Sequence, residues 1–223
     1  MKPSLPVLLS VNGGFVDTAG FLALQGLFTS HVTGNFVTLG AALVLGTSGV
    51  LAKLLALPMF CAVVLTTRLL SNALPAGPWP ALHTLLGVKL LLLIAGACLA
   101  IRLGPFHSGD GWQALVTGMT LVAAMAIQNA IHRIHMASTS PTNIMTGNTT
   151  QLMIDLADTM RRLSPEARAS IHARLHRMSA SVLAFAIGCS AAALFYAFRG
   201  DWCFVVPPFI ALTALWVHEP KPD

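Results

Sequence analysis

Long apolar stretches, each interrupted by only a few polar residues, make up most of this chain. Uncharged stretches of about 18 residues or more are long enough to cross a bilayer as a helix. They predict long helices over residues 5–28, 50–70, 81–101, 111–134, 178–198 and 202–217. The pattern therefore predicts an all-α, polytopic membrane protein that forms a single transmembrane domain over residues 1–223.

One tripeptide, Thr-Gly-Asn, occurs twice and begins a short apolar stretch each time. The surrounding segments read SHVTGNFVTLG over residues 30–40 and NIMTGNTTQLM over residues 143–153. Each stretch is too short to cross about 30 Å of hydrocarbon as a helix, so six long helices and two short ones are expected. The two copies are Thr33-Gly34-Asn35 and Thr146-Gly147-Asn148.

A polar pair lies inside the apolar run that precedes each tripeptide. The pair is Asp17-Thr18 in the first run and Gln128-Asn129 in the second. The same order of polar pair, gap, tripeptide and short helix, found twice, predicts an internal duplication. The repeat halves are expected over residues 5–101 and 111–217.

The number of membrane crossings stays open at this level. Short helices that cross give eight spans and parallel halves, whereas re-entrant short helices give six spans and inverted halves. Counts of lysine and arginine in the loops favour neither topology, but both place the N-terminus in the cytoplasm. The segment that decides this orientation contains Arg161, Arg162, Arg168, Arg174 and Arg177.

The composition supports the membrane assignment and narrows the chemistry. Only 9% of the 223 residues are charged, and the mean hydropathy is +0.74, whereas soluble domains carry about 25% charged residues. The net charge of +5 comes mostly from a segment next to a membrane helix. Such a segment is more typical of contact with lipid headgroups than with nucleic acid, so we expect no nucleic-acid partner.

No residue pattern points to a metal, a cofactor or an enzymatic reaction. The four cysteines are scattered through apolar runs without metal-binding spacing. Two histidine pairs, His132/His135 and His172/His176, have helical spacing but no cysteine or carboxylate nearby to complete a ligand set. Signatures of a catalytic nucleophile are also missing. We therefore expect no metal, no cofactor and no enzyme.

Broken helices at matching places of two halves favour a solute site between them. Backbone N–H groups at an interrupted helix start are unpaired, and they attract polar or anionic groups. The threonines of the tripeptides can cap, the glycines allow close approach, and the asparagines supply a donor and an acceptor. The alternative is that each tripeptide is only a turn and cap. The candidate substrate-binding residues are Asp17, Thr33, Gly34, Asn35, Gln128, Asn129, Thr146, Gly147 and Asn148.

Asp17 is the acidic group of this candidate site, and Gln128 takes its place in the second half. A carboxyl inside the membrane is expensive and suggests a proton-coupling role. Alternatively, it is a structural group satisfied by Lys89, His83 or the backbone of Gly34. Lys89, the other intramembrane charge, is a candidate charge partner of Asp17 or extends to the membrane surface.

The two tripeptides, the opening GGFVDTAGFLAL and the stretch MAIQNAIHR resemble the YoaK-like family of bacterial inner-membrane proteins, whose function is unknown. The resemblance covers residues 13–209. It implies a multi-pass protein of the bacterial inner (plasma) membrane and supplies no substrate.

Together these observations favour a small-solute permease or secondary transporter. Its expected partners are the lipid bilayer and an unknown small polar or anionic solute, and homo-oligomers are also conceivable. A non-transporting scaffold or regulatory partner that uses the basic segment is the main alternative, and a membrane enzyme is third.

Overall fold

The computed structural model describes residues 4–73, 81–161 and 164–217, so Arg162 of the basic segment lies outside the described residues. Within that part of the chain, five helical segments are long and apolar enough to cross a membrane, with α7 to α8 counted together. The predicted all-α, polytopic membrane fold is confirmed. The elements are α1 (Leu5–Ala23), α2 (Gly34–Leu45), α3 (Val50–Ala73), α4 (Ala81–Leu103), α5 (Trp112–His135), α6 (Met145–Thr159), α7 (Pro165–Arg199), the 3₁₀ helix η1 (Gly200–Val205) and α8 (Val206–Leu215).

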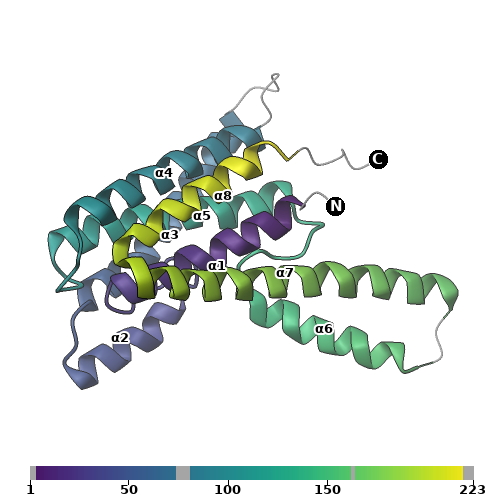
Figure 1. Ribbon diagram of the computed structural model, residues 1–223. Helices are drawn as coiled ribbons and strands as arrows, with labels where there is room; N and C mark the ends of the chain where they lie inside the picture. The colour runs from purple at the N-terminus through teal and green to yellow at the C-terminus, as the bar shows by residue number, and fades with distance from the viewer. Residues whose placement is uncertain (1–3, 74–80, 162–163, 218–223) are drawn as a thin grey trace.

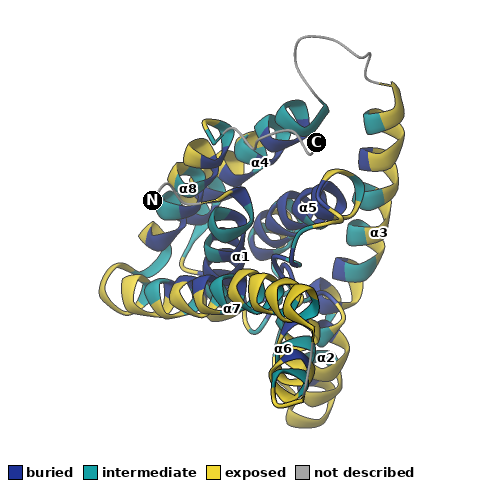
Figure 2. Ribbon diagram, turned by 90° about the vertical axis from the view of Figure 1, so that its right-hand side faces the viewer, coloured by how far each residue is buried: buried dark blue, intermediate teal, exposed yellow. Residues whose placement is uncertain are grey.

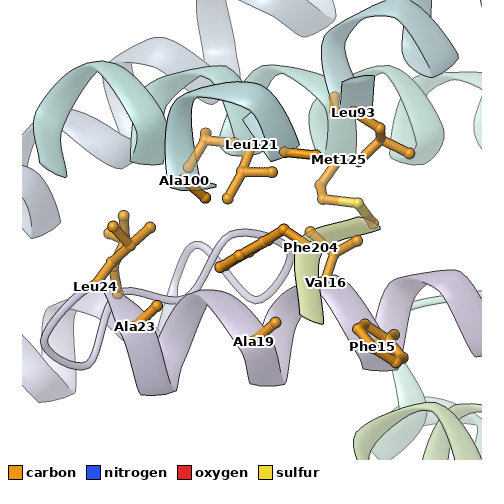
Figure 3. Close-up of a cluster of buried hydrophobic side chains, with 14 of the residues drawn as sticks. Phe15, Val16, Ala19, Ala23, Leu24, Leu93, Ala100, Leu121, Met125 and Phe204 are labelled. Carbon is orange, nitrogen blue, oxygen red and sulfur yellow. The ribbon is translucent and has the colours of Figure 1, made fainter. Parts of the chain in front are cut away.

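Helices α1 and α5 form the centre of the bundle and are its most buried helices (Figure 2). Helix α1 packs against α7 and α8, whereas α5 packs against α3 and α4. Each central helix therefore contacts two helices from the other half of the chain. Their shared core is apolar, and Figure 3 shows Phe15 and Val16 of α1 in the same cluster as Leu121 and Met125 of α5.

Small residues bring α1 and α7 close together. A Cβ atom on Gly14 would overlap the carbonyl of Phe185, and one on Gly188 would overlap the carbonyl of Val11. Close contact of this kind is a usual way for helices to associate in lipid, where no hydrophobic effect drives them together.

The described chain runs along the bundle six times, in α1, α3, α4, α5, α7 and η1–α8. At one end, here called the linker end, Lys53 near the start of α3 donates to the carbonyl of Gln25, just after α1, at 2.8 Å. At the other end, here called the terminal end, Ser71 near the end of α3 is 3.2 Å from His135 at the end of α5. Helix α2 therefore returns to the end at which α1 finished.

Helix α6 likewise does not run the length of the bundle, because it stays at the terminal end, where α5 finishes and α7 begins (Figure 1). As a result, α1 and α5 run in opposite directions, as do α3 and α7, and α4 and α8.

Helix α7 is longer than the bundle, and its first turns project past the terminal end together with α6 (Figure 1). We call this projecting pair the α6–α7 arm. Asp155 of α6 is completely buried and accepts a hydrogen bond from Arg174 Nε at 2.6 Å. The guanidinium of Arg174 holds the pKa of Asp155 below its ordinary value. As predicted, Ser164 and Pro165 begin α7, and the Ser164 side chain accepts from the N–H of Ala167.

Some helix bounds differ from the predicted ones. The first helix ends at Ala23 instead of about residue 28, because Gln25 and Gly26 adopt positive φ angles of 55° and 81° and turn the chain. The basic segment and the predicted helix over 178–198 form one continuous helix. The final predicted helix is divided into η1 and α8.

Asp110, in the connection between α4 and α5, caps the start of α3. Its carboxylate accepts from the N–H groups of Gly49 at 2.9 Å, Leu51 at 2.7 Å and Ala52 at 3.3 Å. Partial burial raises the pKa of Asp110, but these backbone N–H donors outweigh burial, and the pKa is lowered overall. The linker between the two halves is thereby attached to a helix of the first half.

We expect Asp110→Ala to lower the free energy of unfolding by about 1 kcal/mol, the typical contribution of a helix N-cap. Because the folded-state pKa is lowered, the stabilisation is fully present above the ordinary Asp pKa of about 4 and is lost as the pH falls through the folded value. Thermal unfolding in detergent between pH 3 and 7 tests this. Asp158→Ala is the control, because Asp158 is partly exposed and its ion pair with the guanidinium of Arg161 is long, at 4.0 Å. Equal melting temperatures for the Asp110 variant and the wild type would show that Asp110 does not stabilise the start of α3.

Candidate functional site

The asparagine of each tripeptide ties its short helix to the break that precedes it. Asn35 Nδ2 donates to the carbonyl of Phe28 at 2.8 Å, and Asn35 Oδ1 accepts from the N–H of Phe28 at 2.8 Å. Asn148 Nδ2 donates to the carbonyl of Pro141 at 2.8 Å. Pro141 has no N–H to form the second bond. Both asparagines are buried. The donors of both, and the acceptor of Asn35, are therefore used within the protein.

The carboxylate of Asp17 closes the first break, between α1 and α2. Its Oδ1 accepts from the N–H groups of Thr29 at 2.8 Å and Ser30 at 2.7 Å. Its Oδ2 lies 2.6 Å from Nδ1 of His31. These donors offset the cost of placing a carboxylate among apolar helices, which is roughly 2.5–3.5 kcal/mol at the centre of a membrane helix. Asp17 is only 5% exposed, so its stability depends on these local partners.

Gln128 makes the corresponding contacts with the second break, between α5 and α6. Its Nε2 donates to Asn143 Oδ1 at 2.7 Å and lies 3.3 Å from Thr142 Oγ1. Its Oε1 accepts from Nζ of Lys89, which is completely buried. Lys89 therefore meets Gln128 instead of Asp17, and it does not reach the surface. The difference from the expected pairing arises because Lys89 lies on α4, which packs against α5 and not against α1.

The two breaks contact each other inside the bundle. The imidazole of His31 in the first break contacts the backbone of Asn143 in the second. Helix α1 also passes directly against the second break, because a Cβ atom on Gly13 would overlap Asn143 Oδ1. Five residues form what we call the polar chain: Asp17, His31, Asn143, Gln128 and Lys89. Neighbours in it are joined by side-chain hydrogen bonds, except that His31 lies close to the backbone of Asn143.

An open cleft lies beside each break. The first cleft, of about 490 Å³, lies between α1, α2 and α7 nearer the linker end. The second, of about 330 Å³, lies between α3 and α5 nearer the terminal end. Residues of the first cleft include Asp17, Thr18, Phe28, His31, Gly34 and Phe185. Residues of the second include Phe60, Arg68, Asn129, Arg133, Asn143 and Ile144.

The threonines and the second glycine of the tripeptides do not have the expected roles. Thr33 occupies the N-cap position of α2, but its side chain makes no capping hydrogen bond. Thr146 is already inside α6 and lines an exposed groove along that helix. A Cβ atom on Gly34 would lie 3.1 Å from the ring of Phe28, so this glycine does allow the ring to approach the backbone closely. A Cβ atom on Gly147 would meet no described atom within 4 Å.

The first backbone N–H groups of α2 already have acceptors. Those of Gly34, Asn35 and Phe36 donate to carbonyls of the preceding turn at 2.8, 3.1 and 3.2 Å. Backbone groups inside a membrane must be satisfied within the protein, since no water replaces their partners. The anion that binds N–H groups at this break is the protein's own carboxylate, on Asp17.

Sequence reasoning did not identify His31 and Asn143 as site residues, although together they join the two breaks. Each is a polar residue shortly before a tripeptide, in SHVTGN and NIMTGN, and that position was the available signal. It also did not identify Arg68 and Arg133 as residues of the second cleft. Nothing in the sequence brings α3 beside α5.

The fold and these buried polar contacts define a polytopic helical membrane protein with two internal helix breaks. The chain matches the family "Protein of unknown function (DUF1275)" over residues 5–217, and it belongs to that family. It is 31% identical to the UPF0700 transmembrane protein YoaK of Bacillus subtilis (strain 168) over 166 residues, which cover 70% of this chain and 68% of that protein. The resemblance to the YoaK-like family is therefore confirmed. No solved structure matches the chain.

We expect Asn35→Ala to destabilise the protein more than Asn148→Ala, because Asn35 makes two hydrogen bonds to backbone groups and Asn148 makes one. Leaving a buried backbone group without its partner costs about 1–3 kcal/mol. Melting temperatures in one detergent, followed by tryptophan fluorescence, measure the difference. The exposed residue Thr146, changed to Ala, is the control. If both asparagine variants have the melting temperature of the control, the hydrogen bonds assigned to Asn35 and Asn148 do not stabilise the protein.

Proposed function

We propose that this protein is a small-solute permease, a secondary transporter of the bacterial inner membrane whose solute path passes the two helix breaks. One observation carries the proposal: the breaks of two oppositely directed halves lie side by side, with His31 close to the backbone of Asn143 and Gly13 of α1 directly against the Asn143 side chain. In inverted-repeat transporters, solute sites lie where broken helices of the two halves meet. The proposal assigns no enzymatic reaction to the protein.

The proposal includes an inverted duplication of the two halves. The tie from Asn35 to Phe28 and the tie from Asn148 to Pro141 both span seven residues. The packing of α1 against α7 and α8 corresponds to that of α5 against α3 and α4. Each cleft accordingly lies between the first helix of one half and the third helix of the other. Motion of one half against the other would change both clefts together.

We further propose that the terminal end faces the cytoplasm. The exposed basic residues of the α6–α7 arm, including Arg168 and Arg177, lie at that end, and basic residues favour the cytoplasmic side. Lipid chains would cover the exposed apolar side chains of the outer helices, such as Val37 and Val44 of α2.

Asp17 and His31 are suited to carry a coupling proton. Asp17 Oδ2 lies 2.6 Å from His31 Nδ1, and both residues line the first cleft. Protonating the carboxylate would weaken its attraction for the N–H groups of Thr29 and Ser30. The first break would then be held less tightly, which couples proton binding to the shape of the cleft. Gln128 cannot change charge in this way, so the coupling belongs to the first half alone.

A scaffold or regulatory protein is the second candidate, and the α6–α7 arm favours it. The arm extends beyond the bundle, and an ion pair between buried Asp155 and partly exposed Arg174 joins its two helices. A transporter does not require this projection for the solute path proposed above, whereas a cytoplasmic partner could bind it.

Transport is tested with purified protein in liposomes, using solid-supported-membrane electrophysiology and a panel of carboxylates, amino acids, polyols and amines under a pH gradient. We expect at least one solute class to give a current that depends on the pH gradient. His31→Gln should reduce that current at least about tenfold, because it removes the proton acceptor beside Asp17.

His172→Gln, on the exposed surface of the arm, is the matched control and should retain the current. Melting temperatures of both variants verify folding. Correctly folded wild-type protein that moves no solute of the panel would favour the scaffold function.

Cysteine labelling in intact cells tests the orientation. In a background without the four native cysteines, we expect Ser108→Cys to react with an impermeant maleimide and Ser138→Cys to be protected, because these residues lie at opposite ends of the bundle. Ser48→Cys should behave like Ser108→Cys, since the Ser48 hydroxyl accepts a hydrogen bond from Gly109. Labelling of positions 48 and 138 from the same side would contradict the six-crossing arrangement.

A further inference from the structure

The second cleft has a cationic rim and an apolar wall. Arg68 of α3 and Arg133 of α5 both line it, and both are exposed. Within the described residues, neither arginine forms an ion pair. The apolar wall includes Phe60, Val64 and Ile144. Two guanidinium groups without a carboxylate favour an anion, and the wall favours an apolar group attached to that anion.

Asn143, which lines the same cleft, carries a buried donor that has no partner among the described residues. Asn143 is 2% exposed, and its Oδ1 accepts from Gln128. Its Nδ2, however, has no hydrogen-bond partner although it is buried. Leaving such a group unpaired costs about 1–3 kcal/mol. Asn143 lines the cleft, so a turn of its side chain toward the cleft would bring this donor to an acceptor atom of a bound molecule.

The first cleft offers the opposite charge. It is lined by the carboxylate of Asp17, which would repel an anion. Its walls include Phe28 and Phe185, and none of the described residues that line it is an arginine or a lysine. The two clefts are therefore alike in position but different in charge, and only the second matches an anionic ligand.

We propose that the second cleft binds an amphiphilic organic anion. Arg68 and Arg133 hold its carboxylate or phosphate group, Asn143 Nδ2 donates to one of its oxygens, and its apolar part packs against Phe60 and Val64. The cleft volume of about 330 Å³ is at the small end of the range for ligand pockets. The inference names the substrate class of the permease and in that respect rests on the proposed function.

Two sources could supply this chemistry. A free organic acid would enter as a solute, whereas an anionic phospholipid would place its headgroup at the rim from the surrounding bilayer. Binding can be measured without any flux, so failure of this inference is distinguishable from failure of the transport proposal.

The test uses the full-length protein in phosphatidylcholine nanodiscs and titrates it with hexanoate and, separately, with neutral hexanamide by calorimetry. We expect hexanoate to bind and hexanamide to bind at least about tenfold more weakly. The double variant R68Q/R133Q should lose at least about tenfold in hexanoate affinity. The matched control is R102Q, which changes an exposed arginine of α4 at the linker end. This variant should bind hexanoate with the wild-type affinity.

A second arm measures retention of phosphatidylglycerol by native mass spectrometry after extraction from nanodiscs that contain it. Retention that falls in R68Q/R133Q but not in R102Q, without hexanoate binding, supports the anion site and assigns it to lipid. The variant N143A, with its melting temperature checked, should weaken whichever anion binds. The proposal is overturned if neither anion binds, or if R68Q/R133Q and R102Q bind it equally.

Discussion

The absence of water inside a bilayer is the constraint on which this structure depends. A helix that stops within the membrane exposes backbone groups that only the protein can satisfy. At the first break, Asp17 of the preceding long helix and Asn35 of the following short one both bond backbone groups. At the second, Asn148 bonds the backbone carbonyl of Pro141, whereas Gln128 bonds the side chain of Asn143. The main structural role of the tripeptide is therefore to satisfy backbone groups where the helix is interrupted.

That solution also limits where function can reside. Groups that close a break are not free to bind a solute, which removes the asparagines and the first N–H groups of α2 from the list of ligand donors. What remains are the groups that line the clefts beside the breaks and the polar chain that joins the breaks. In that chain, His31 and Asn143 are central, because each contacts the other half of the chain.

Hydrophobic pattern alone was sufficient for the class of fold and the positions of most helices, because burial in lipid acts on every residue of a span. It also located both breaks. It could not assign partners to buried polar groups, since those depend on which helices are neighbours and how each is rotated. Lys89 illustrates this: its charge was evident, but its contact with Gln128 follows from the packing of α4 against α5. Likewise, the early end of α1 follows from the backbone turn at Gln25.

The two clefts lie in similar positions but carry different charges, so the two halves of the protein are not equivalent. Both clefts lie beside a break and between helices of different halves, yet one contains the carboxylate of Asp17 and the other the guanidinium groups of Arg68 and Arg133. Folding alone requires similar packing at the two places, not opposite charges. If the halves move against each other, a proton at the acidic cleft and an anion at the basic one would favour different arrangements. Such a division of roles would link the polar chain to the proposed transport, because the chain runs from Asp17 beside the acidic cleft to Asn143 beside the basic one.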